Sequence, residues 1–176
     1  MDATAIAALV EESAKKSGVL WVRATGPRHR AQPLWQVWHE GAIYVVTGGI
    51  EQPAPEGLTD RAYVILRSKD KRSRLVTIEA DVEAVAPDSE EWSAVVPVLT
   101  AKRLNLPDGE HARERWRHEC VVYRLRPTGD VVETPDEPTT SSHAAAPPPT
   151  PARTRVPRPR HLRGRPRRSR GWRSGA

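Results

Sequence analysis

The longest regular pattern in the chain is an alternation of apolar and polar residues from Leu75 to Ala86. One set of alternate positions is apolar and the other is mostly polar: Val76, Ile78, Ala80, Val82, Ala84 and Ala86 against Leu75, Thr77, Glu79, Asp81, Glu83 and Val85. Successive side chains of a strand point to opposite faces of its sheet. The pattern therefore predicts a long antiparallel strand with one face on a core and the other towards water.

Five shorter segments are also rich in β-prone residues and are bounded by turn residues: 19–24, 34–39, 42–47, 62–68 and 120–125. The segment 42–47 is apolar on both faces, so we expect it to be a central strand. Short strands with tight connections favour an antiparallel sheet over a doubly wound α/β fold, which needs a helix between strands. Six such strands can close into a small barrel.

Three segments are predicted to be helices. Residues 2–16 show apolar positions at helical spacing, and Gly18 is placed to end that helix. Ser89 is a suitable N-cap for a second helix, in which Pro97 should produce a kink or a break. Residues 110–118 form the third, short helix. The fold class expected is thus mainly β (α+β), with helices flanking a six-stranded antiparallel sheet.

The positive charge of the chain is concentrated at its C-terminal end. The whole chain carries a formal net charge of +6, whereas residues 131–176, with ten arginines and three acids, carry +7, which leaves residues 1–130 close to neutral. We expect residues 1–130 to form the folded domain and residues 131–176, which contain nine prolines, to form a disordered tail. Such a tail is either an extension without a specific partner or a weak, salt-dependent contact for nucleic acid or anionic surfaces.

Cysteine content and hydropathy point to a cytoplasmic protein. Cys120 is the only cysteine, so no disulfide can form within the chain, as suits a reducing compartment. No apolar run approaches the roughly 20 residues that span a bilayer. The N-terminus, Met1-Asp2-Ala3-Thr4, lacks the basic flank of a signal peptide.

Four stretches together carry a family resemblance: residues 18–24 (GVLWVRA), 32–47 (QPLWQVWHEGAIYVVT), 62–69 (AYVILRSK) and 74–85 (RLVTIEADVEAV). In order and pattern they resemble the pyridoxamine 5'-phosphate oxidase-like, FMN-binding split-barrel family, over about residues 1–127. The resemblance implies a six-stranded split β-barrel, a homodimer, and a flavin cofactor (FMN) or a deazaflavin coenzyme held at the dimer interface.

By position, the resemblance assigns five residues to the grip on the cofactor phosphate. They lie at the ends of the middle strands: Thr47, Arg67, Ser68, Lys69 and Arg74. An arginine can bind phosphate with two parallel hydrogen bonds, and a lysine contributes a point charge. The alternative is that the basic residues after Ser68 are only a solvated turn.

One loop departs from the family pattern. Many members wrap the phosphate with a loop rich in serine, lysine and arginine after the third strand, but residues 48–57 here contain two acids and no base. The departure is compatible with another cofactor, another phosphate grip, or a member without cofactor. The hypotheses are therefore a flavin- or deazaflavin-dependent oxidoreductase acting on an unknown small-molecule substrate, a non-catalytic module that binds flavin, haem or nothing, and a nucleic-acid-associated protein acting through its tail.

The histidines, the cysteine and the tryptophans indicate less about function. The histidines show no metal-ligand spacing, no nucleophile motif occurs, and Cys120 is expected to be a small buried apolar residue. Trp35 and Trp38 lie on opposite faces of one predicted strand, so one should face the barrel core and the other a helix or a partner chain.

Overall fold

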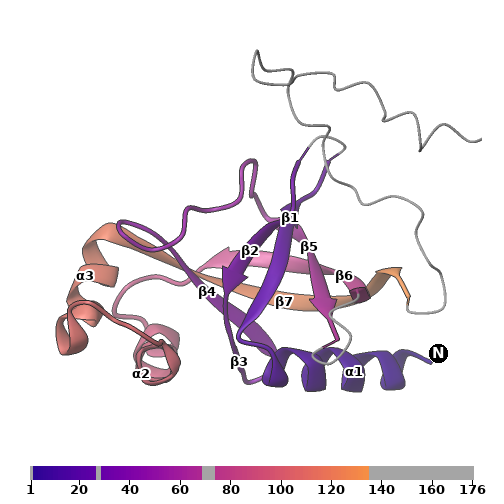
Figure 1. Cartoon of the computed structure of the whole chain (residues 1–176), viewed down its shortest axis with the longest axis horizontal. Helices are drawn as coiled ribbons and strands as arrows, with labels where there is room; N and C mark the ends of the chain where they lie inside the picture. Colours follow the sequence, from indigo (N-terminus) through magenta and orange to yellow (C-terminus); the bar gives the residue numbers. More distant parts are fainter. Residues whose placement is uncertain (1, 27–28, 69–73, 135–176) are drawn as a thin grey trace, which may run out of the picture. The chain divides into compact units, whose positions relative to one another are not determined.

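The structure is a computed structural model of the full chain and describes residues 2–26, 29–68 and 74–134 (Figure 1). It contains the elements α1 (Ala3–Lys16), β1 (Val19–Ala24), β2 (Gln32–Trp35), β3 (Val37–His39), β4 (Ala42–Gly48), β5 (Arg61–Arg67), β6 (Arg74–Ala84), α2 (Glu90–Lys102), η1 (Gly109–His111), α3 (Ala112–Glu119) and β7 (Cys120–Glu133). Residues 135–176 lie outside the described residues, so the disorder expected of the tail stays a prediction.

All strand pairs are antiparallel, and the strands follow the order β2-β1-β5-β6-β7-β4-β3. The first and last strands of this order, β2 and β3, are separated in the chain only by Gln36. The sheet must therefore curl until its two ends meet at that residue, which gives a partly closed barrel. The predicted antiparallel α+β fold is confirmed. The seventh strand arises because the single strand predicted over 34–39 is bent at Gln36, with each half paired to a different neighbour.

Gln36 also ties the end of α1 to this seam. Its backbone N–H donates to the Gly18 carbonyl at 3.1 Å, and its side-chain Nε2 donates to the carbonyls of Ala14, at 2.7 Å, and Ser17. The last carbonyls of a helix have no partner within the helix, so these bonds satisfy groups that would otherwise be exposed or unpaired. At the other end, Asp2 accepts from the Ala5 N–H and caps the helix.

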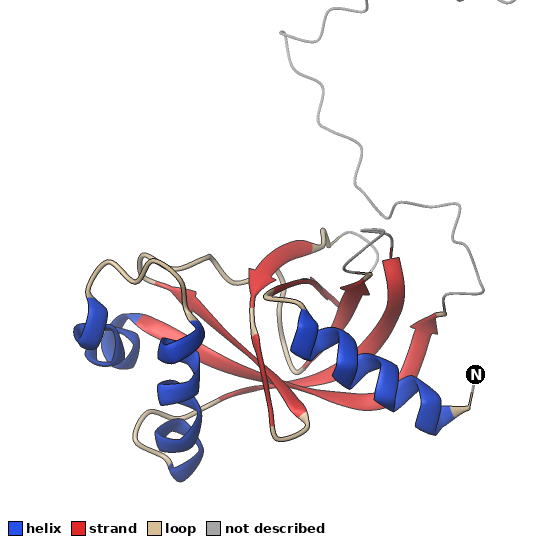
Figure 2. Cartoon of the chain, turned by 60° about the horizontal axis from the view of Figure 1, so that its bottom comes forward, coloured by secondary structure: helices blue, strands red, loops and turns tan. Residues whose placement is uncertain are grey.

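The sheet has an apolar core on each face. The inner core fills the barrel and includes the buried face of α1: Val10, Ala14, Leu20, Val22, Leu34, Ile43, Val45, Ala62, Val64, Leu66, Val76, Ile78, Ala80, Val82 and Leu125. The outer core lies between β4, β7 and the helices α2 and α3 (Figure 2). β4 is buried on both faces, as predicted. Trp38 packs against the inner core and Trp35 against the outer one, which confirms their opposite placement.

The predicted end of the last strand is wrong. The last strand was expected to end at Leu125, but β7 continues to Glu133. The register jumps from Ala80↔Pro127 to Ile78↔Val131, so a bulge absorbs the intervening residues and a proline without an N–H can sit in the strand. Pro97 does not divide α2, which continues through it. Among the described residues, no helix is long and apolar enough to cross a membrane.

Candidate functional site

The sheet separates Thr47 from the other predicted phosphate-binding residues. Thr47 lies opposite Val121 at the start of β7 and is 2% exposed. Arg67 and Arg74 pair with each other at the opposite end of the sheet, where β6 begins. With its side chain buried, Thr47 does not line the cavity to which Arg67 contributes. Lys69 lies outside the described residues.

Arg67 and Ser68 do share a cavity of about 170 Å³ with the last turns of α1. Its other lining residues are Leu9, Glu12, Ser13, Lys16, Ser17 and Leu75. The contribution of α1 was not predicted from the sequence, because nothing in its helical pattern shows which strand ends the helix packs against. The cavity combines two cations with three hydroxyl groups, the donors that phosphate oxygens accept from.

Arg67 contacts an aromatic ring rather than an acid that the structure describes. Its guanidinium carbon lies 4.7 Å from the centre of the Trp21 ring, across the exposed face of β1 and β5. Among the described residues it makes no hydrogen bond or ion pair. A guanidinium on an aromatic ring keeps its N–H donors free for a ligand, because the ring contact is made through the face of the cation.

Two other basic residues that the structure describes at this end, Lys16 and Arg74, are already paired. Lys16 contacts Glu12 at 2.5 Å, and the hydrogen bond and charge of Lys16 hold the pKa of Glu12 below its ordinary value. Arg74 contacts Glu133 at 2.5 Å, and Glu133 also accepts from the Thr77 hydroxyl at 2.8 Å. Of these three basic residues, Arg67 is the one whose charge a ligand could engage without first displacing an acid that the structure describes.

Beside this cavity, the outer face of β1 and β5 carries partly exposed aromatic rings. Trp21 is paired with Ile65, and Tyr63 is paired with Arg23, whose guanidinium carbon lies 4.7 Å from the Tyr63 ring centre. The Arg23 Nε atom is buried without a partner among the described residues. This face can receive a flat aromatic group, because it offers ring faces and cations in alternation.

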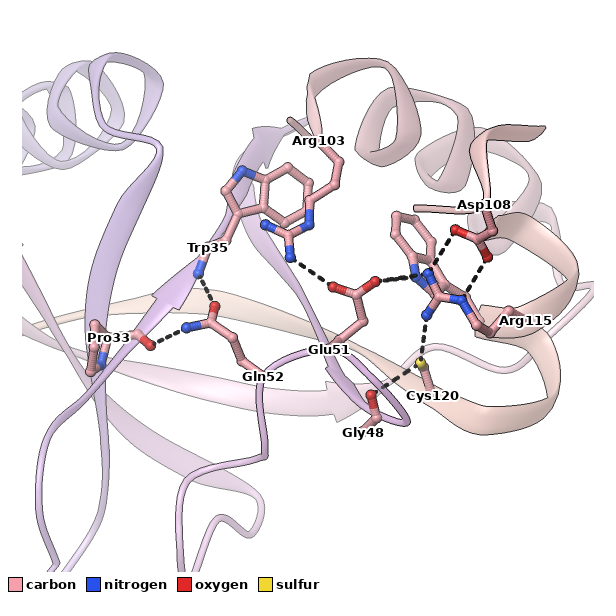
Figure 3. A network of polar contacts seen from close by, with 10 residues as sticks. Pro33, Trp35, Gly48, Glu51, Gln52, Arg103, Asp108, Arg115 and Cys120 are labelled. Atoms are coloured by element: carbon pink, nitrogen blue, oxygen red, sulfur yellow. Dashed lines mark hydrogen bonds and ion pairs between the residues drawn. The ribbon is translucent and has the colours of Figure 1, made fainter. Parts of the chain in front are cut away.

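The acidic loop of residues 48–57 belongs to a network of ion pairs and hydrogen bonds that the sequence did not predict. Glu51, whose side chain is 5% exposed, accepts from Arg103 Nη2 at 2.9 Å, Arg115 Nη2 at 3.1 Å and Trp116 Nε1 at 3.0 Å (Figure 3). Burial by itself would raise the pKa of Glu51, but the bonds from Trp116 and the two arginines outweigh it and hold the pKa below its ordinary value. The partners lie more than 50 residues away in sequence, so no local pattern indicates them.

This network fastens the loop to α2 and α3 and leaves no cation for a phosphate. Asp108 takes two further N–H groups of Arg115, at 2.6 and 3.0 Å. Cys120 lies beside Arg115 and Gly48 and is half-buried rather than buried as predicted, and the burial that it has raises the pKa of its thiol. A Cβ on Gly49 would lie 3.2 Å from the Cys120 sulfur, so the glycine serves close packing in a tight turn.

Comparison with known proteins gives structural likeness only. No protein-family model and no curated protein matches the chain. Three solved structures resemble it: HutZ, a heme storage protein of Vibrio cholerae (14% identity, TM-score 0.49, 68% of this chain and 88% of that one), an FAD-binding protein, mll6688, of Mesorhizobium loti (13%, 0.44, 69% and 87%), and General Stress Protein 26 of Bacillus anthracis str. Sterne (12%, 0.38, 67% and 88%). The fold therefore rests on the chain's own strand order. The described residues contain no cluster of three or more metal-ligating side chains.

Proposed function

We propose that this chain is a split-barrel protein that binds a phosphate-bearing flavin-class cofactor, FMN or a deazaflavin coenzyme, at the cavity between α1 and the end of β5. The observation that carries the proposal is Arg67, a cation whose guanidinium carbon lies 4.7 Å from the Trp21 ring centre and which has no acid partner among the described residues. Ser13 and Ser68 contribute hydroxyl groups to the lining of the same cavity, whereas the hydroxyl of Ser17 donates to the Val19 carbonyl.

The cavity has room for only one part of the cofactor. About 170 Å³ is room for a phosphate group but not for a ring system of three fused rings. The ring would lie outside the cavity, against Trp21 and Tyr63 on the outer face of β1 and β5. A bound flavin would supply hydride or electron transfer, and the residues of this chain would hold its phosphate and one face of its ring.

A homodimer is part of this proposal. Thr47 is buried in its own chain and takes no part in the proposed site. A partner placed on the outer face of β1 and β5 would cover the other side of the ring and exclude water. The function that we propose for such a site is oxidoreductase activity on a small substrate. The alternative is a non-catalytic module that binds the cofactor.

The test is a visible spectrum of the purified full chain followed by titration with FMN, riboflavin, a deazaflavin coenzyme and haem. We expect FMN to bind more tightly than riboflavin, which lacks the phosphate. Arg67→Met should weaken FMN binding about tenfold or more, because a charge-assisted contact is lost, and should change riboflavin binding less than FMN binding.

Arg61→Met is the matched control. Arg61 lies at the other end of β5 and is paired with Glu79 and Asp81, at 2.8 and 3.4 Å. Equal FMN affinities of the two variants would refute the phosphate site. A haem band without flavin binding would support the non-catalytic module. Turnover with a reduced or oxidised partner substrate would establish the oxidoreductase.

A further inference from the structure

A cavity of about 360 Å³ lies between the first half of α1 and the barrel, and it shares no described lining residue with the phosphate cavity. Val10 and Ile78, two residues of the inner core, line it together with Trp38, which is partly buried and packs against that core. Small-molecule sites commonly have volumes of about 300–1,000 Å³, and the mouth of a β-barrel is one of their usual places. The volume and the position are therefore those of a ligand site.

The face of α1 that lines this cavity carries small side chains. Four residues contribute, and their spacing of three or four residues places them on one face of the helix: Ala3, Ile6, Ala7 and Val10. Alanine fills less of the space between a helix and a sheet than a larger apolar residue does. The first two turns of α1 therefore lie against the barrel without filling the space between them, and Ile6 and Trp38 stay partly exposed there.

A bulge in β7 shapes another part of the lining. At the register shift, residues 128–130 of β7 stand against a single residue of β6. Pro127, Thr128 and Gly129 line the cavity, and the Thr128 hydroxyl fastens the bulge to β6 by donating to the Glu79 carbonyl at 3.2 Å. Bulges of this kind often lie beside functional sites, because they move a strand away from its regular position. The space is thus a product of the sheet as well as of the helix.

The lining offers a ligand no unneutralised charge. Among the described residues that line the cavity, Glu11 is the only charged one, and its carboxylate contacts Lys15 at 2.6 Å. The Thr128 hydroxyl is used by its bond to Glu79. An ion placed here would lose part of its hydration without gaining a partner of opposite charge, so the cavity favours a neutral molecule.

We propose that this cavity binds a neutral, mainly apolar molecule with one or two rings. Contact with Ile6, Trp38 and Ile78 stabilises the complex, because it removes apolar surface of both partners from water. The volume of about 360 Å³ is near the lower end of the usual range for ligand sites, as suits a molecule of this size. The site is independent of the one proposed for the flavin-class cofactor.

NMR of the full chain can test this through the indole N–H signals of Trp38 and Trp35, assigned with Trp38→Phe and Trp35→Phe. The probes are indole, which is neutral, and indole-3-carboxylate and tryptamine, which carry a negative and a positive charge on the same ring system. We expect indole to shift the Trp38 signal saturably and to bind about threefold or more tightly than either charged probe. Trp35 packs against the outer core and is the internal control, whose signal should not shift.

Ala7→Leu places a larger side chain in the cavity and should weaken indole binding about tenfold or more, since the interior has no room for both. Ala8→Leu is the matched control, because Ala8 is the next residue of α1, is exposed and does not line the cavity. It should leave indole binding within about twofold. Ala3→Leu, at another lining position, takes the place of Ala7→Leu if that variant does not fold.

The cofactor site and this cavity can be told apart. Ala7→Leu should leave FMN binding unchanged, and Arg67→Met should leave indole binding unchanged, so the two proposals stand or fail separately. The present one is overturned if the Trp38 signal does not shift up to about 10 mM indole, or if a charged probe binds as tightly as indole. It is also overturned if the lining variant and Ala8→Leu bind indole alike.

Discussion

Replacing Glu51 by glutamine should destabilise the domain by about 3 kcal/mol at neutral pH. The side chain of Glu51 is 5% exposed and accepts hydrogen bonds from Arg103, Arg115 and Trp116. Hydrogen bonds to a charged group contribute about 1.5–3 kcal/mol each, and a buried ion pair that loses one partner costs about 3–5 kcal/mol. Glutamine keeps the shape and one acceptor oxygen, but its NH₂ group would face an arginine donor, so the lower end of that range applies.

The same substitution should change how stability depends on pH. The pKa of Glu51 in the folded protein lies below its ordinary value of 4.5. Its contribution is therefore complete above that value and is lost as the pH falls through the lowered pKa, where the carboxylate takes up a proton. The stability difference between the native protein and Glu51→Gln should thus be largest at neutral pH and should shrink towards about pH 4 and below.

Urea unfolding of both proteins across this pH range, followed by tryptophan fluorescence, measures the difference. Glu56→Gln is the control, because Glu56 lies in the same loop, is exposed and undergoes the same chemical change. It should cost less than about 0.5 kcal/mol. If Glu51→Gln costs no more than Glu56→Gln, or if its cost does not shrink in acid, the network does not stabilise the fold in the way described.

Two further predictions concern single side chains. Burial, with help from a hydrogen bond to Glu91 at 2.8 Å, raises the pKa of Tyr44 to about 12. In an alkaline absorbance titration, Tyr44→Phe should therefore remove the step at the highest pH. Loss of a step at lower pH would contradict this. A Cβ on Gly57, at φ +75°, would lie 2.3 Å from the His29 ring, so Gly57→Ala should destabilise by more than the roughly 1–2 kcal/mol of left-handed strain. In a His29→Ala background only the strain should remain, and an unchanged cost there would show that the ring contact is unimportant.

Local patterns predicted the elements well where one face of a segment meets a core. The alternation that begins at Leu75 corresponds to β6, and the helical spacing before Gly18 corresponds to α1. Patterns were less informative at Gln36 and Pro127. The conformation of a polar residue between two strands, or of a proline inside a strand, depends on which neighbouring strands pair there. Those strands are distant in the chain.

The residues of the candidate site were likewise predicted only in part. Arg67, Ser68 and Arg74 were predicted from their place at strand ends, and Arg67 and Ser68 do share a cavity. Arg74 is paired with Glu133, which lies 59 residues further on. The family resemblance also assigned Thr47 to this group, yet Thr47 is buried opposite Val121 and does not line that cavity.

By itself, the sequence determined the class of the fold. The periodicity of apolar side chains and the stiffness of the chain depend on only a few neighbouring residues, so both can be recognised in a short segment of the sequence. It also determined where charge accumulates, since composition needs no geometry. Only the tertiary structure decided which charges are neutralised. It placed Glu51 among two arginines and a tryptophan, and it left Arg67 on Trp21 without an acid among the described residues. An ion pair depends on distances of a few ångströms between residues far apart in the chain, and the curling of the sheet sets those distances.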